Sequence, residues 1–303
     1  MFRLLARPTN IFSIPFFIGI LSFIFISYNA FYFDVFQAIN SVVLFLAISL
    51  GYYIFNQINL THQSHLPLLM YSLMLIGFYN DGLNFNLAMA LLLINIIILI
   101  LTSEKEVYRK KSYFIVGLLM SLCIMFQAET WPICLFLLVH IITSSERMAY
   151  NILQILFSLL LSLISLAAYR YLMGFELYQD DLLPYISYQF ITDYQWMLLL
   201  LPIVLLLIFA IGKHLLQREQ MSPNSTFRYN LLLIFLLSVM LMAIFYMGEN
   251  YNFLIFLAMP SCIFIARFLL QMQESEWQEI WLWLMIISLI SFKAITYYQL
   301  FDF

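Results

Sequence analysis

The groups of this 303-residue chain that could do chemistry are carboxylates in short loops between long apolar segments. Those that we expect on one side of a membrane are Asp34, Asp81, Glu129, Glu176, Asp180, Asp181, Asp193 and Glu249. Carboxylates that line a cavity open to that side would act as a general base or hold a divalent cation through oxygen ligands. Loops also need solvated charge, and for most of these residues we favour that simpler interpretation.

Glu129 differs from the other carboxylates because it lies in a polar break between two apolar segments that are each too short to span a bilayer. Residues 126–132 read Phe-Gln-Ala-Glu-Thr-Trp-Pro. Pro132 suits the first turn of a new helix, and Glu129 or Thr130 would cap it. An ionisable group at a break within membrane helices is also a functional hypothesis by default. The sequence leaves both interpretations of Glu129 open.

Three further residues are candidates for substrate binding. Asp180 and Asp181 are adjacent in the longest expected outer loop, 173–194, among several aromatic residues. Aromatic rings beside carboxylates suit sugar binding, and they equally suit an interfacial belt. Arg170 lies between two tyrosines near the outer end of an apolar segment. There it would meet a lipid phosphate or extend to the membrane surface.

Other patterns in the chain predict no site. His62 and His65 have no further ligand types nearby, and the three cysteines fall inside apolar segments, so we expect no metal-ligand set. Only 8 glycines occur, and no phosphate-binding loop or dinucleotide motif is present. The net charge of −3 and the lack of a basic block predict no binding of nucleic acid.

The elements that must position these residues are transmembrane helices. Hydrophobic residues make up 64% of the chain and charged residues 10%, against about 25% charged in soluble domains. Backbone groups in lipid must pair within their own segment, which predicts helices. The apolar segments are roughly 11–29, 38–57, 66–79, 83–101, 113–127, 131–143, 149–172, 195–212, 229–247, 251–271 and 280–297. We therefore expect one all-α, polytopic membrane domain over residues 1–303, with about eleven helices (range 9–11).

The distribution of Lys and Arg predicts the orientation. With eleven crossings and a cytoplasmic N-terminus, the outer side keeps only Arg170 and Lys293, while the inner loops hold the other basic residues. Segments 66–79, 113–127 and 131–143 are short. Merging 66–101 into one helix, or 113–143 into one helix, would place the later basic loops on the outer side. We therefore expect short hairpins with tips at 80–82 and 127–130, a location in the inner membrane, and a C-terminus outside.

Residues 110–132, followed by Ser145-Glu146-Arg147, resemble a segment common in GT-C type glycosyltransferases. The segment in those enzymes has the same order of elements: a basic turn, a Gly-containing apolar helix, a polar break and a second apolar helix. The resemblance covers roughly residues 83–173. GT-C enzymes are multi-pass proteins that use polyprenyl-phosphate sugars, with active sites on the outer face of the membrane.

The GT-C resemblance implies roles for the candidate residues. Asp34 would be the general base on the acceptor, and Glu129, the second carboxylate of the catalytic centre, would bind sugar or a metal ion. Asp180 and Asp181 would bind sugar or a divalent cation, and Arg170 the lipid phosphate. These enzymes usually have a long first outer loop with a catalytic carboxylate, whereas here that loop is short and holds Asp34 alone. A degenerate, non-catalytic relative is therefore an open alternative.

The whole chain also resembles a family of multi-pass inner-membrane proteins of Bacteroidota-type bacteria, because it is rich in Phe, Ile, Asn and Tyr. That resemblance implies a location and no particular activity. Two alternatives to the transferase remain open: a non-catalytic subunit of an envelope assembly complex with membrane-protein partners, and a transporter or lipid flippase whose broken helices form the site. In all three cases membrane lipids are partners of the chain.

Overall fold

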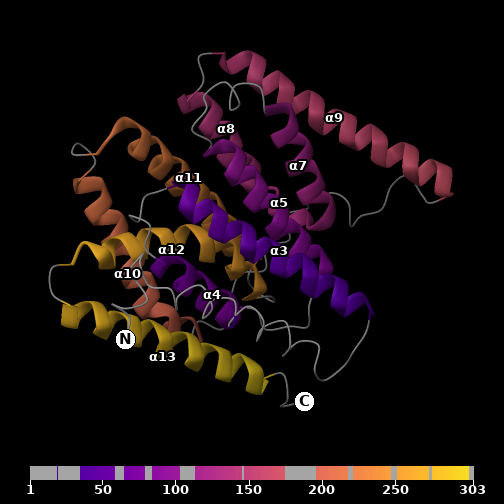
Figure 1. The fold of residues 1–303 in the computed structure, drawn as a ribbon. Helices are drawn as coiled ribbons and strands as arrows, with labels where there is room; N and C mark the ends of the chain where they lie inside the picture. The colour runs from indigo at the N-terminus through magenta and orange to yellow at the C-terminus, as the bar shows by residue number, and fades with distance from the viewer. Residues whose placement is uncertain are drawn as a thin grey trace.

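The computed structural model describes residues 35–58, 65–78, 84–102, 113–144, 147–174, 196–217, 221–246, 251–272 and 275–299, together with Gly19. Every regular element in this described part is a helix (Figure 1). The α-helices are α3 (Val35–Ile58), α4 (Leu66–Phe78), α5 (Phe85–Leu101), α7 (Tyr113–Phe126), α8 (Ile133–Ser144), α9 (Met148–Met173), α10 (Leu201–Leu216), α11 (Pro223–Tyr246), α12 (Ile255–Leu270) and α13 (Ser275–Gln299). Short 3-10 turns, η1 (Ala128–Thr130), η3 (Trp196–Leu200) and η5 (Tyr251–Leu254), precede α8, α10 and α12.

These helices have the composition of membrane helices. The stretches that are long and apolar enough to cross a bilayer are Met148–Met173, Met197–Leu216, Pro223–Tyr246, Tyr251–Leu270 and Glu276–Ile295. The other apolar stretches are shorter: Val35–Gly51 within α3, Leu66–Phe78, Phe85–Leu101, Tyr113–Phe126 and Ala128–Thr143. For example, α7 has 14 residues and α8 has 12, about 21 and 18 Å, against a hydrocarbon core of about 30 Å. The protein is thus all-helical and carries several membrane-type helices.

The predicted segments agree with the observed helices. Each segment from 38–57 onwards contains one described α-helix, and the short segments are separate helices, as predicted. Segment 11–29 lies outside the described residues apart from Gly19, so the total of about eleven helices stays a prediction. Some boundaries were wrong: α13 begins at Ser275, not 280, and α11 begins at Pro223, not 229. At α11, Pro suits the first turn and the Ser222 hydroxyl accepts the amide of Ser225 at 3.4 Å.

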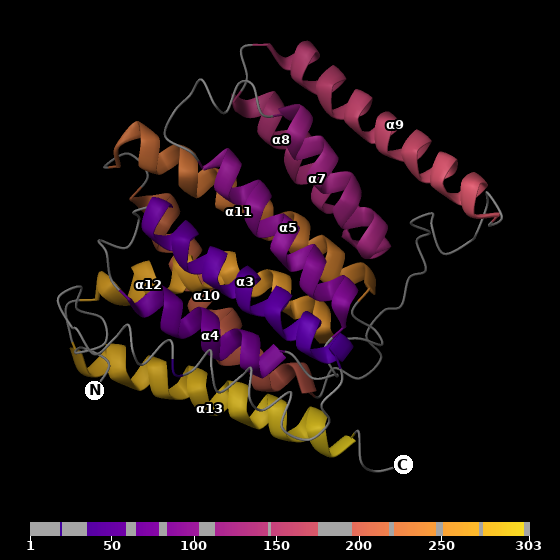
Figure 2. The same ribbon diagram turned by 45° about the vertical axis from the view of Figure 1, so that its right-hand side comes forward.

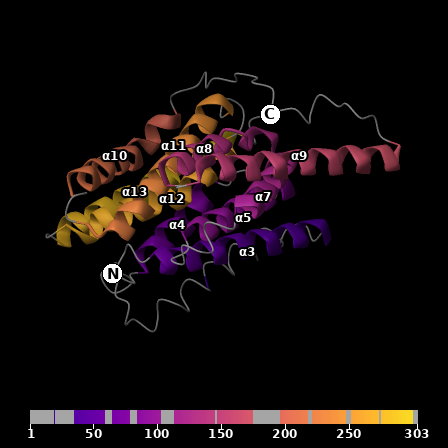
Figure 3. The same cartoon turned by 90° about the horizontal axis from the view of Figure 1, so that it is seen from above.

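The helices form a bundle with α9 at one edge and α13 at the opposite edge (Figure 2). Viewed from above, α3 and α10 lie on opposite faces of this bundle (Figure 3). The centre is α12, which packs against α4, α10 and α11 and is mostly buried. Among the described helices, α9 packs mainly against α7 and, less extensively, against α8, and it is mostly exposed.

Small residues bring α7 and α9 together. A Cβ atom at Gly117 would overlap the Ser158 hydroxyl and lie 3.2 Å from the Ile155 Cα atom, so only glycine permits this approach. One turn further on, the hydroxyl oxygens of Ser121 and Ser162 are 2.6 Å apart. The two residues of each pair, Gly117 with Ser158 and Ser121 with Ser162, are 41 positions apart in the sequence. The two helices therefore run in the same direction with a defined register.

Helix contacts define two ends of the bundle. The ring of Phe85, at the start of α5, contacts two other rings. Its centroid lies 5.9 Å from that of Phe36, at the start of α3, and 5.8 Å from that of Phe126, at the end of α7. We call this the Glu129 end, because η1 follows α7 directly. At the other end Tyr229, near the start of α11, lies 4.3 Å below the guanidinium of Arg267, near the end of α12. We call it the Arg228 end.

Candidate functional site

The polar break predicted at 127–130 is present at the Glu129 end. The carbonyl of Gln127 accepts the Thr130 amide at 3.1 Å and the Thr130 hydroxyl at 2.8 Å, which closes the turn η1. The carbonyl of Pro132 accepts the Leu135 amide at 3.0 Å, so this proline lies in the first turn of α8 as expected. The missing N–H of proline removes a donor that a continuous helix would need, which explains why the chain turns here.

The Glu129 side chain is half-buried, and the side-chain amide of Gln127 donates to its Oε2 at 2.7 Å. Within the described residues, the side chains of Glu129 and Thr130 bond back to Gln127, and the Thr130 hydroxyl also accepts from the Cys123 thiol at 3.5 Å. In this described part of the chain, neither side chain accepts an amide of α8. This geometry does not favour the helix-cap interpretation. It leaves one carboxylate oxygen of a positioned glutamate available to another group.

Aromatic side chains from α11 surround the break. The Trp131 indole N–H donates to the Tyr246 hydroxyl at 2.7 Å, and the Trp131 ring stacks on Phe245 with centroids 6.5 Å apart. The Tyr246 ring in turn contacts Phe253, with centroids 6.4 Å apart. The sequence pattern marks Trp131 only as part of the break and gives no sign of Tyr246, which lies 115 positions away. No local pattern could have connected them.

Asp34, the predicted general base, lies outside the described residues, but the helix that follows it is placed. The α3 helix begins at Val35, and Phe36 packs against Phe85, which packs against Phe126 next to the break. The residue that follows Asp34 is therefore at the same end of the bundle as Glu129. No distance between the two carboxylates follows from this.

The break is set back from the tip of α9. By the α7–α9 register, Phe126 at the end of α7 is level with Ala167. The α9 helix continues to Met173, about 9 Å further at 1.5 Å per residue, and it visibly overhangs α7 in Figure 1. Gly174 ends α9 with a positive φ of 73°, the left-handed conformation that glycine adopts without strain. If α9 spans the bilayer, Glu129 lies below the membrane surface.

The remaining predicted residues are less well defined. Arg170 is half-buried in the overhanging last turn of α9, so the structure brings it to the Glu129 end. Asp180 and Asp181 lie outside the described residues. Within the described ranges, no group of three His, Cys, Asp or Glu residues that could hold a metal ion occurs.

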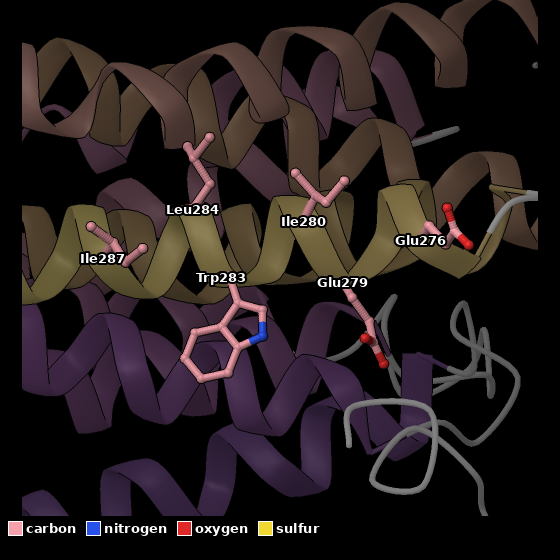
Figure 4. Close-up of a pocket in the computed structure, with 6 residues that line it drawn as sticks. All are labelled: Glu276, Glu279, Ile280, Trp283, Leu284 and Ile287. Carbon is pink, nitrogen blue, oxygen red and sulfur yellow. The ribbon is translucent and has the colours of Figure 1, made fainter.

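A surface groove of about 520 Å³ runs along α13 (Figure 4). Its lining residues all come from this one helix: Glu276, Glu279, Ile280, Trp283, Leu284 and Ile287. Its carboxylates belong to the first turns of α13, at the Arg228 end, so the groove is separate from the Glu129 break. A stripe of apolar residues on the outside of a membrane helix is the surface that lipid covers.

Comparison with known proteins gives a family. No curated protein and no solved structure matches the chain. A family model described as "Family of unknown function (DUF6427)" matches residues 1–298. The match covers nearly the whole sequence, so the chain belongs to the DUF6427 family.

Proposed function

We propose that this protein is a GT-C-like transferase that moves a sugar from a polyprenyl-phosphate carrier at the outer face of the inner membrane. The observation that carries the proposal is the half-buried Glu129 carboxylate, held by Gln127 in a break set back from the end of α9. A lipid-linked substrate has its reacting carbon close to the membrane surface, so an enzyme for it needs a carboxylate at that depth. Stacked rings beside the break, including Trp131, suit a sugar face.

The proposed chemistry uses both carboxylates: Asp34 acts as the base, and Glu129 binds the sugar or a divalent cation beside it. Asp34 takes the proton of an acceptor hydroxyl, whose oxygen then attacks the anomeric carbon of the sugar. The bond from that carbon to the carrier phosphate breaks, and the phosphate leaves with the electron pair. Arg170, at the same end, or a divalent cation held by Asp180 and Asp181 stabilises the phosphate charge that develops.

A specific observation disfavours a transporter driven by ion pairs. The charged residues of the described part lie near helix ends: Glu129, Arg147, Arg170, Lys213, Arg228, Arg267, Glu276, Glu279 and Lys293. Charge at the centre of the described helices would be expected for an intramembrane ion pathway. The assembly-subunit alternative requires no chemistry at Glu129 and is separated from the transferase by the following experiment.

The experiment replaces the carboxylates by amides in a strain that lacks the chromosomal copy. Loss of a general base typically lowers a rate by about 100-fold to 10,000-fold, so Asp34→Asn should fail to restore activity. Glu129→Gln should fail as well, because a neutral amide binds a sugar hydroxyl or a cation more weakly than a carboxylate does. Mass spectrometry of extracted lipids should then show accumulated polyprenyl-phosphate sugar. Glu276→Gln is the matched control, because this exposed glutamate lies at the opposite end of the bundle.

Two outcomes would contradict the transferase. One is an unchanged pool of lipid-linked sugars in the deletion strain. The other is full function of both amide variants at wild-type protein levels, which would leave the assembly subunit as the better explanation. Loss of the protein itself in Glu129→Gln would instead mark that glutamate as a structural residue.

A further inference from the structure

Two helices at opposite edges of the bundle, α9 and α13, each keep a long apolar face exposed. Only 17% of the apolar window of α9 and 28% of that of α13 is buried. Both helices are long enough to span a bilayer, and Figure 2 shows them along the two edges of the bundle. Such a face is covered either by lipid or by another helix, and the residues on the two faces indicate which.

Both helices begin at the Arg228 end and run in the same direction. The ring centroid of His140, close to the end of α8, lies 5.6 Å from that of Phe227 at the start of α11, so α9 begins at this end. In the first turn of α13, the side-chain amide of Gln278 donates to the carbonyl of Met272, just after α12, at 2.8 Å. Topology gives every copy of a membrane protein the same orientation, so α9 of one copy and α13 of a neighbour would lie parallel and at the same depth.

The α13 helix has a stripe of exposed residues at alternating intervals of four and three. Its members are Glu276, Ile280, Trp283, Ile287, Ile290 and Ala294. This is the spacing with which two parallel helices pack along a shared seam. The surface groove of about 520 Å³ runs along the first four of these residues (Figure 4). The α13 helix thus has a hollow along the line where a parallel helix would lie.

The outer face of α9 has the same spacing, here in alternating intervals of three and four. Its exposed members are Tyr150, Leu153, Phe157, Leu160, Ile164 and Ala167. They lie on the side of the helix away from Ser158 and Ser162, which face α7. Large side chains such as Phe157, which is 60% exposed, form the ridge that a groove on a facing helix accepts.

The charges at the starts of the two helices are opposite. Arg147 precedes α9, Glu276 lies in the first turn of α13, and both side chains are exposed. The start of a helix carries about half a positive charge, and α9 starts after Arg147 without a side-chain cap. A cation is unfavourable at that place, and a carboxylate from a neighbouring copy would offset it.

Lipid alone accounts less well for the head of the α13 groove. The positive-inside rule predicts that the Arg228 end faces the cytoplasm, where anionic lipids give the membrane surface a negative potential. Within the described residues, the carboxylates at this end are Glu276 and Glu279, and both line the groove. A cationic side chain of a protein suits them better than an anionic headgroup does.

We propose that the outer face of α9 in one copy of this protein packs into the α13 groove of a second copy, with Arg147 beside Glu276. The two faces differ, so the contact is heterologous and its repetition gives a ring or a row of copies. No residue of this contact belongs to the proposed sugar-transfer centre, and neither proposal depends on the other. Loss of the Glu276 charge alone leaves the apolar seam in place.

Cysteine cross-linking between two differently tagged copies tests the contact in native membranes. Phe157 is ten positions after Arg147, and Ile287 is eleven positions after Glu276, so the two lie at nearly the same depth. In a background without the native cysteines, oxidation by copper phenanthroline should join Phe157→Cys in one copy to Ile287→Cys in the other. Either variant expressed alone should give no cross-linked dimer, because the contact joins unlike faces.

Leu46→Cys is the matched control on α3, where this leucine is 48% exposed. Leu46 lies ten positions after Phe36, which is close to the level of Phe126. Val116 lies ten positions before Phe126, and the α7–α9 register places it level with Phe157. The control cysteine is therefore exposed at the same depth on another face, and it should form no cross-link with the α13 cysteine.

An exchange of charges gives a second readout. Glu276→Lys should lower the cross-linked fraction about 2-fold to 5-fold, the typical effect of an exposed charge pair. Arg147→Glu in the same protein should restore it, because the two charges are opposite again. No cross-link between the α9 and α13 cysteines, or an equal yield with the α3 control, would overturn the proposal. A cross-linked dimer of the α9 variant alone would indicate a symmetric contact and would also overturn it.

Discussion

At the residue scale, the close approach of α7 and α9 depends on one glycine. Gly117 lets α7 lie directly on the Ser158 side chain and the Ile155 backbone of α9. Because lipid is as apolar as leucine, no hydrophobic force brings two membrane helices together, and close packing must supply the attraction. The Ser121–Ser162 contact adds a polar interaction within the same interface. These small residues thus hold α9 to the rest of the bundle.

We predict that Gly117→Ala destabilises the protein by about 1–3 kcal/mol, because the added methyl group overlaps Ser158 and approaches the backbone of α9. Thermal unfolding in detergent would measure the change. The double variant Gly117→Ala with Ser158→Gly should recover much of the loss, since the overlapping atoms are removed. Gly212→Ala is the control: nothing lies within 4 Å of a Cβ atom there, and alanine is the better helix former. Equal destabilisation by both alanine variants would contradict the packing argument.

At the scale of elements, the informative feature is the interruption between α7 and α8. Neither helix is long enough to cross a bilayer by itself, and the two are joined by residues 127–132, which contain the three-residue turn η1. At the far end of the pair, the Tyr113 hydroxyl and His140 Nε2 are 3.4 Å apart, so α8 returns along α7 as a hairpin. The turn therefore places Gln127 and Glu129 on one side of the membrane. Their depth below the surface depends on the lengths of α7 and α8.

The hairpin predicts where a cysteine at the half-buried Ala128 would react. In a background without Cys123, Cys134 and Cys262, Ala128→Cys should be modified from the outer side of intact cells by a small impermeant thiol reagent. We expect slower modification than at an exposed loop position, because the tip is set back from the end of α9. Reaction from the cytoplasmic side alone would show that the hairpin is oriented the other way.

At the scale of the whole molecule, charge is divided between the two ends of the bundle. Arg147, Lys213, Arg228 and Arg267 lie at the Arg228 end, and within the described residues the Glu129 end keeps Arg170 and Lys293. The end at which each of these residues lies follows from the directions of the helices. Those directions come from contacts between side chains and not from hydropathy. The positive-inside rule then predicts that the Arg228 end faces the cytoplasm.

Two exposed positions test this orientation, in the background that lacks the native cysteines. Met173, at the end of α9, is 59% exposed, and Ser222 is exposed just before α11. An impermeant maleimide should modify Met173→Cys in intact cells and should modify Ser222→Cys only after the membrane is opened. The reverse pattern would place the Arg228 end outside, and the Glu129 site would then face the cytoplasm.

The sequence by itself predicted the helices and the break between α7 and α8. Both depend on local chemistry: apolar runs in lipid must form helices, and Gln-Ala-Glu-Thr-Trp-Pro interrupts an apolar run wherever it occurs. The charge pattern also predicted that the short segments are separate helices. Boundaries were less accurate at α11, because its first polar turn extends beyond the apolar run that marked it.

Only the tertiary structure decided which helix faces are buried and which distant residues meet. The α9 and α12 helices are almost equal in mean hydropathy, yet 17% of the apolar window of α9 is buried, against 78% for α12. A helix in lipid is apolar on every side, so the periodicity that marks a buried face in a soluble protein is missing. For the same reason the Trp131–Tyr246 contact follows from helix packing, which no local pattern in the sequence encodes.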